Sequence, residues 1–90
     1  MSVMIIGGDR LGNIVKNLQI YGYDVVKHVS GRKKREVNCN IPCNIDMVMV
    51  FTDYVNHEVV NTIKREGKKR NFKMIFVKRS WSHIADEIKI

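Results

Sequence analysis

The strongest constraint on the fold is the segment 46–52, which holds five consecutive apolar residues at positions 47–51. A continuous apolar run bounded by polar residues is typical of a strand buried on both faces of a parallel sheet. Residues 3–6 form a shorter run of the same kind, which ends at Gly7 and Gly8. Because a strand buried on both faces needs helices on both sides, the two runs predict an α/β domain.

Three other stretches have features of amphipathic helices. Apolar residues from Leu11 to Leu18 recur at i, i+3, i+4 and i+7, and Gly22 can end this helix. A second helix is expected after Asp53, which can cap its first turn, with Gly67 after its last turn. A third helix is expected after Ser80, which is also a good capping residue.

Two further strands, at residues 24–29 and 72–77, complete an order in which strands and helices alternate. Right-handed crossovers then predict a small Rossmann-like or flavodoxin-like parallel sheet of four strands in the order 2-1-3-4, with three helices. The connection at residues 30–44 carries Pro42, two cysteines and four consecutive cations instead of a helical pattern. We therefore expect one face of the sheet to be thinly covered and predict a homo-oligomer.

Length and charge bound the class of protein. Ninety residues with 44% hydrophobic side chains predict a single α/β domain over residues 1–90. No apolar run approaches the ~18 residues that span a bilayer, and no export signal is recognisable, so we expect no membrane association and a cytoplasmic location. Sixteen Lys and Arg against nine Asp and Glu give a net charge of +7, which favours anionic partners.

Polar, glycine and aromatic residues follow each of the four predicted strands. The carboxyl ends of parallel strands lie at one edge of the sheet, and ligands bind there at the point where the strand order reverses. We therefore predict a site for a small anionic or aromatic ligand near the first and third strands. Its candidate residues are Gly7, Gly8, Arg10, Arg32, Asp53, Tyr54, His57, Arg79, Ser80 and Trp81.

The turn at residues 7–12 follows a strand and opens a predicted helix, which is the setting of a phosphate-binding turn whose N–H groups face an anion. Asp9 stands where the dinucleotide fingerprint has its second glycine, and a carboxylate there would crowd and repel a pyrophosphate. A dinucleotide is therefore disfavoured. Asn13 follows Gly12, so the P-loop sequence is absent as well.

His57 is the candidate metal ligand. It is expected in the first turn of the second helix, where the helix N-terminus favours the neutral imidazole and so keeps a lone pair for a metal. Tyr54 and Trp81 would supply aromatic walls beside it. Arg10, Arg32, Lys78 and Arg79 would supply cations for carboxylates. This combination suits haem, which we predict as the cofactor, with His57 as the iron ligand.

Other chemistries at these residues stay open. Cys39 and Cys43 could bind zinc together with His57, but no second cysteine pair follows, so free thiols and a redox pair are alternatives. Asp53 and His57 could act as an acid–base pair on a phosphorylated substrate. His28 lies within the second predicted strand, where we expect a packed or edge histidine.

Three motifs give the chain a family resemblance. They are Ser30-Gly31-Arg32, the Thr-Asp-x-Val-x-His element at residues 52–57 and the Arg-Ser-x-Ser element at residues 79–82. With them the chain resembles a bacterial family catalogued as domain of unknown function 2325, over nearly its whole length. The resemblance implies a small α/β domain and haem binding in some members. It also implies that His57 is the family's histidine and that Arg79 and Ser80 form its basic-serine element.

The leading hypothesis is a small ligand-binding module, not an enzyme, that uses haem for redox chemistry or gas sensing. The alternative is a basic nucleotide- or nucleic-acid-binding domain, which the cationic runs at residues 32–35 and 64–70 favour. No RRM, KH or helix-turn-helix signature supports the alternative. The two hypotheses differ in the salt dependence of binding, which is steep for nucleic acid.

Overall fold

Strands β1 (Ser2–Ile6) and β3 (Met47–Phe51) form the centre of a four-stranded parallel sheet. The outer strands are β2 (Asp24–Val29), which pairs with β1, and β4 (Lys73–Val77), which pairs with β3. The order β2-β1-β3-β4 confirms the predicted order 2-1-3-4. This computed structural model describes residues 1–30 and 41–89.

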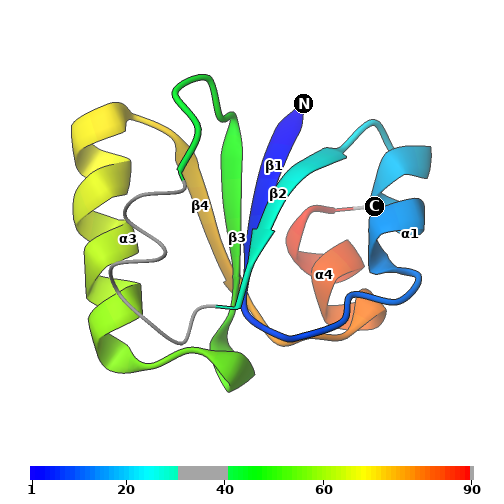
Figure 1. Ribbon diagram of the computed structural model, residues 1–90. Helices are drawn as coiled ribbons and strands as arrows, with labels where there is room; N and C mark the ends of the chain where they lie inside the picture. Colours follow the sequence, from blue (N-terminus) through cyan, green and yellow to red (C-terminus); the bar gives the residue numbers. More distant parts are fainter. Residues whose placement is uncertain (31–40, 90) are drawn as a thin grey trace.

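Helices lie on both faces of the sheet (Figure 1). On one face lies α3 (His57–Arg70). On the other face lie α1 (Ile14–Ile20) and α4 (Trp81–Glu87). A short 3-10 helix, η1 (Thr52–Tyr54), separates β3 from α3. These three α-helices, found among the described residues, confirm the α/β class and the helix number expected from the sequence.

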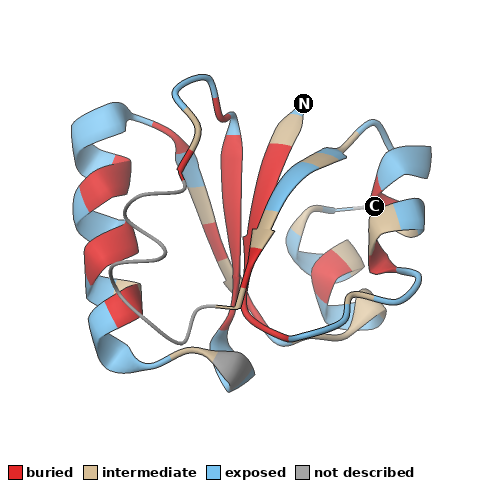
Figure 2. Ribbon diagram, in the orientation of Figure 1, coloured by how far each residue is buried: buried red, intermediate tan, exposed pale blue. Residues whose placement is uncertain are grey.

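The two faces of the central strands build two separate hydrophobic layers. Successive side chains of a strand point to opposite faces, so Met4 and Val48 pack in the same layer as Ile63 of α3. Val3 and Ile5 belong to the other layer, under α1 and α4. All five residues of β3 have no exposed surface, and the buried residues concentrate along the central strands in Figure 2. Both faces of β3 therefore need helical cover.

The ends of α3 differ from the expectation. Asp53 does not cap the helix, because η1 comes first, and Asn56 takes the cap position: its Oδ1 accepts a hydrogen bond from the Val59 N–H at 2.9 Å. Gly67 lies inside the helix rather than after it. The helix ends at Asn71, whose φ of 63° lies in the left-handed region that Asn tolerates better than most residues.

The first helix is shorter than its hydrophobic pattern. It begins at Ile14 rather than at Leu11, because Gly12, with a φ of 56°, keeps the preceding turn out of the right-handed helical conformation. Its end agrees with the prediction, since Gly22 follows it with a φ of 86°. The turn after β1 is therefore longer than expected and stands apart from the first turn of α1.

Truncating a core residue of α3 tests the two-layer packing. Ile63 is fully buried, so Ile63→Ala should lower the free energy of unfolding by about 3 kcal/mol through lost burial and an unfilled cavity. Ile20 is 70% exposed, and Ile20→Ala should change it by less than about 0.5 kcal/mol. Urea denaturation measures both values. Equal losses in the two variants would contradict the assigned packing.

Candidate functional site

Arg79 joins three of the turns at the carboxyl ends of the strands. It follows β4, and its backbone N–H donates a hydrogen bond to Asp53 Oδ1, after β3, at 3.2 Å. Its guanidinium Nη2 donates to the backbone carbonyl of Arg10, after β1. The side chain also passes Gly8, where an added Cβ would lie 3.4 Å from Arg79 Cδ. The turns after β1, β3 and β4 therefore meet at one edge of the sheet, which is where ligands bind in folds of this type.

His28 ties the fourth strand to the same place. Its Nε2 lies 3.1 Å from the carbonyl oxygen of Gly7 and 3.0 Å from that of Gly8. Carbonyl oxygens only accept hydrogen bonds, so Nε2 must carry the proton and donate it. The partly buried imidazole of His28, on β2, thus hydrogen-bonds two carbonyl groups of the turn after β1. The sequence pattern predicts a packed or edge histidine in this strand but gives no sign of the contact, which depends on the pairing of β1 with β2.

Between these turns lies a hollow of about 360 Å³. The described residues that line it are Gly8, Asp9, Arg10 and Arg79. Two arginines and one aspartate are among these lining residues, so their net formal charge is positive. Guanidinium groups bind carboxylates and phosphates through parallel hydrogen bonds. The hollow therefore has the charge and the donor type that suit an anion.

One N–H group of the glycine turn is engaged within the sheet and is not available to an anion. The N–H of Gly7 donates to the carbonyl of Val29 at 2.9 Å, because the turn continues the ladder between β1 and β2. Gly7 and Gly8 have φ angles of 112° and 76°, which L side chains rarely adopt. The two glycines therefore shape the turn and let Arg79 approach it. Positive charge at this site comes from arginine side chains.

His57 and Trp81, both predicted to line the site, are not among the described residues of the hollow. His57 is the first residue of α3 and is exposed. Trp81 is the first residue of α4 and stacks on Tyr21, with ring centroids 6.1 Å apart. It also packs against the hydrophobic layer under α1 and α4. This aromatic face serves helix packing, and the pairing with Tyr21 had no signal in the local sequence.

The remaining predicted residues have separate positions. Ser80 occupies the cap position of α4 without a side-chain capping bond, and its Oγ forms a hydrogen bond with Ser82 Oγ at 3.0 Å. Tyr54 belongs to η1, but its side chain lies outside what the structure describes. Arg32 lies outside the described residues altogether. Of the ten candidates, the structure thus gathers the glycine turn, Arg10, Asp53 and Arg79 around one point.

The described residues form no cluster of three or more His, Cys, Asp or Glu side chains suited to a metal ion. The zinc hypothesis used Cys39, which lies outside this part of the chain. Cys43 is an exposed free thiol. If the described residues bind a metal, fewer than three clustered side chains of these types would be its ligands. A haem iron held by one imidazole is a site of this kind. Nor does any helix in the described ranges have the length and apolar character to cross a bilayer.

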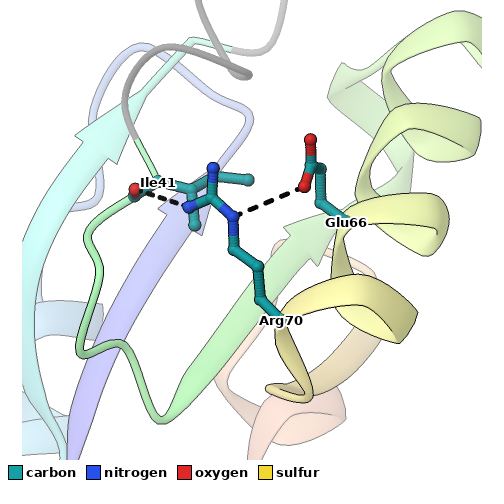
Figure 3. Close-up of polar contacts among 3 residues, drawn as sticks. All are labelled: Ile41, Glu66 and Arg70. Carbon is teal, nitrogen blue, oxygen red and sulfur yellow. Dashed lines mark hydrogen bonds and ion pairs between the residues drawn. The ribbon is translucent and has the colours of Figure 1, made fainter.

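Arg70 fixes the chain where it returns from the basic segment to the sheet (Figure 3). Its Nη1 donates to the carbonyl of Ile41 at 2.9 Å, and its Nε lies 3.4 Å from Glu66 Oε2 on the previous turn of α3. Ile41 is buried in the layer under α3, and Glu66 is also buried. Arg70 therefore has a structural contact, although the sequence shows it only as one member of a cationic run.

Together, the sheet order and the hollow define a flavodoxin-like α/β domain with a cationic hollow at the carboxyl ends of its strands. The chain belongs to the family described as an uncharacterized protein conserved in bacteria, DUF2325, whose profile matches residues 2–90. This match confirms the resemblance drawn from the three sequence motifs. No match was found among curated proteins.

A similar solved structure is the signal receiver domain of a modulated diguanylate cyclase from Desulfovibrio desulfuricans G20, described as an example of alternate folding. The TM-score is 0.64 at 21% sequence identity, and the match covers 98% of this chain and 71% of that chain. At this identity the likeness shows the fold alone. It agrees with the flavodoxin-like order of the strands.

Removing the imidazole of His28 tests its role in the turn. His28→Ala leaves the carbonyls of Gly7 and Gly8 without this donor and should lower the free energy of unfolding by about 1–2 kcal/mol. His28→Gln keeps an N–H donor and should recover part of the loss. Urea denaturation gives the energies, and the amide NMR signals of Gly7 and Gly8 should shift most in the Ala variant. Unchanged glycine signals would contradict the contact.

Proposed function

We propose that the chain is a small ligand-binding module that holds an anionic group of its ligand between Arg10 and Arg79. The observation that carries this proposal is the position of Arg79. Its half-buried side chain lies against Gly8, is bonded to the Arg10 carbonyl, and borders the hollow. A cation held in this way is preorganised, so an anion would bind without first ordering it.

The chemistry of the two arginines supports a carboxylate or a phosphate as the anionic group. A guanidinium carries five N–H donors in a planar fork, so the bond from Arg79 to the Arg10 carbonyl uses only part of its donor capacity. The hollow lies beyond the carboxyl end of β1, where the strand order reverses. In open α/β sheets this is the general position of ligand sites.

Substitution of Arg10 tests the anion site with little disturbance. The hydrogen bond from Arg79 is to the backbone carbonyl of Arg10, which a change of the Arg10 side chain leaves in place. In calorimetric titrations with phosphate, pyrophosphate and citrate, the wild-type protein should bind at least one anion. Arg10→Gln should weaken that binding by at least about tenfold, the loss of one charge-assisted hydrogen bond. Arg65→Gln, on α3 outside the described lining of the hollow, should change it less than about twofold. Equal weakening by both variants would reject the site.

Haem is the ligand that we propose from the sequence, with His57 holding its iron. The described residues suit the carboxylates and the iron of a haem but not an aromatic wall beside it. Arg10 and Arg79 suit its carboxylates, and the exposed imidazole of His57 is accessible. An aromatic wall from Trp81 is not supported, since that ring stacks on Tyr21. A bound haem would supply redox or gas-binding chemistry, and the chain would supply its orientation and charge.

Haemin titration tests this ligand. The wild-type protein should shift the Soret band of haemin, and His57→Ala should abolish the shift because it removes the proposed iron ligand. His83→Ala is the matched control, since His83 is also an exposed helical histidine and lies on α4. An unchanged haemin spectrum with wild-type protein would end the haem proposal. It would leave the anion site to be judged by the titrations of Arg10→Gln.

A homo-oligomer and a cytoplasmic location stay predictions from the sequence. The first came from the unusual connection at residues 30–44, of which residues 31–40 lie outside the described part of the chain. Neither prediction is needed for the anion site, because every residue used in its argument belongs to one chain.

A further inference from the structure

A groove of about 510 Å³ lies at the β4 edge of the sheet, apart from the anion site. The described residues that line it are Lys64, Arg65, Lys68, Met74 and Phe76. The first three belong to α3 and the last two to β4. The groove thus combines an apolar floor with a cationic wall.

The floor results from uneven cover of the two faces of β4. Ile75 and Val77 point to the α4 side and are buried. Met74 and Phe76 point to the α3 side and are only partly buried. Gly67 lets the Met74 side chain lie against α3, because a Cβ at this position would come within 2.5 Å of Met74 Sδ. The absence of a side chain at Gly67 therefore allows this position of Met74.

The cationic run of α3 divides into two sides. Arg70 is directed toward Ile41, as described above. Lys64 and Lys68 border the groove, and Lys64 Nζ lies 5.4 Å from the centre of the Phe76 ring. Within this cationic run, Arg70 thus makes a structural contact, whereas Lys64 and Lys68 line the groove.

β4 is an outer strand, and among the described residues it pairs with β3 alone. One edge of an outer strand carries backbone N–H and C=O groups that can pair with an added strand. The flavodoxin-like order continues with a further strand beyond the fourth. The groove and this strand edge therefore lie together, on the same element.

We propose that β4 and the groove bind an extended peptide segment, added to the sheet as a further strand, that carries both acidic and apolar residues on the face it turns toward α3. Alternate side chains of a strand point to opposite faces. The set on the α3 side would lie along the groove, where its apolar members would cover Met74 and Phe76 and its acidic members would meet Lys64 and Lys68. Backbone pairing gives affinity in this mode of recognition, and the groove gives specificity.

The charges and the ring geometry favour this occupant over two others. A second copy of the chain would bring the same cations and a net charge of +7 against the groove, which opposes association. Single-stranded nucleic acid binds by stacking bases on open aromatic faces. The Phe76 ring instead has the Lys64 ammonium over it, and Met74 offers no ring.

The test uses a fluorescent peptide in which Val and Glu alternate at every second position, with Thr at the positions between, titrated with the 90-residue chain in an anisotropy assay. Lys68→Glu should weaken binding by about tenfold, since it places a carboxylate in the cationic wall. Lys69→Glu is the matched control: it makes the same charge change on the next residue of α3, outside the described lining, and should weaken binding less than about twofold. Bound peptide should also slow hydrogen exchange of the β4 amides.

Gly67→Ala probes the apolar floor without reversing a charge. It should weaken binding by displacing Met74, while the higher helix propensity of Ala helps to keep α3 folded. Equal effects of Lys68→Glu and Lys69→Glu, or unaltered exchange of the β4 amides, would overturn the proposal. It would also be overturned if the peptide failed to bind, or if oligothymidylate displaced it with equal affinity.

Discussion

The burial of residues 3–6 of β1 and of all five residues of β3 is the constraint on which the rest of this structure depends. Side chains with no exposed surface in the middle of a sheet require helices on both sides. Parallel strands joined by helices place all their carboxyl ends at one edge. The residues after the strands therefore gather there, and the polar groups that cannot enter the core supply the chemistry of that edge.

Arg79 connects the turns around the proposed anion site. Its backbone contacts Asp53, its guanidinium contacts the Arg10 carbonyl, and its chain passes Gly8, so one residue connects three turns. His28 completes the connection from β2. A site with this many internal contacts has its main cation already oriented, which lowers the entropic cost of binding an anion. The β4 groove is independent of it, since α3 and the outer strand build that groove.

The sequence predicted the four strands and their order, because apolar runs and topology determine these features. It placed the cap of α3 at Asp53 instead of Asn56, since the short η1 turn has no distinctive pattern. It treated Trp81 as a ligand-facing ring, whereas the Tyr21 partner comes from a distant part of the chain. It named Arg79 but not its contacts, which depend on long-range geometry. Such details require three-dimensional packing.

The central claim is that the strand ends form an anion site around Arg79, and NMR of the ¹⁵N-labelled chain tests it most directly. Titration with inorganic phosphate should shift the backbone amides of Gly8, Asp9, Arg10 and Arg79 first and most strongly, with one common saturation curve. The largest shifts on the lysines of α3, or small shifts spread evenly over the cationic surface, would contradict the claim. They would show that phosphate responds to net charge rather than to this site.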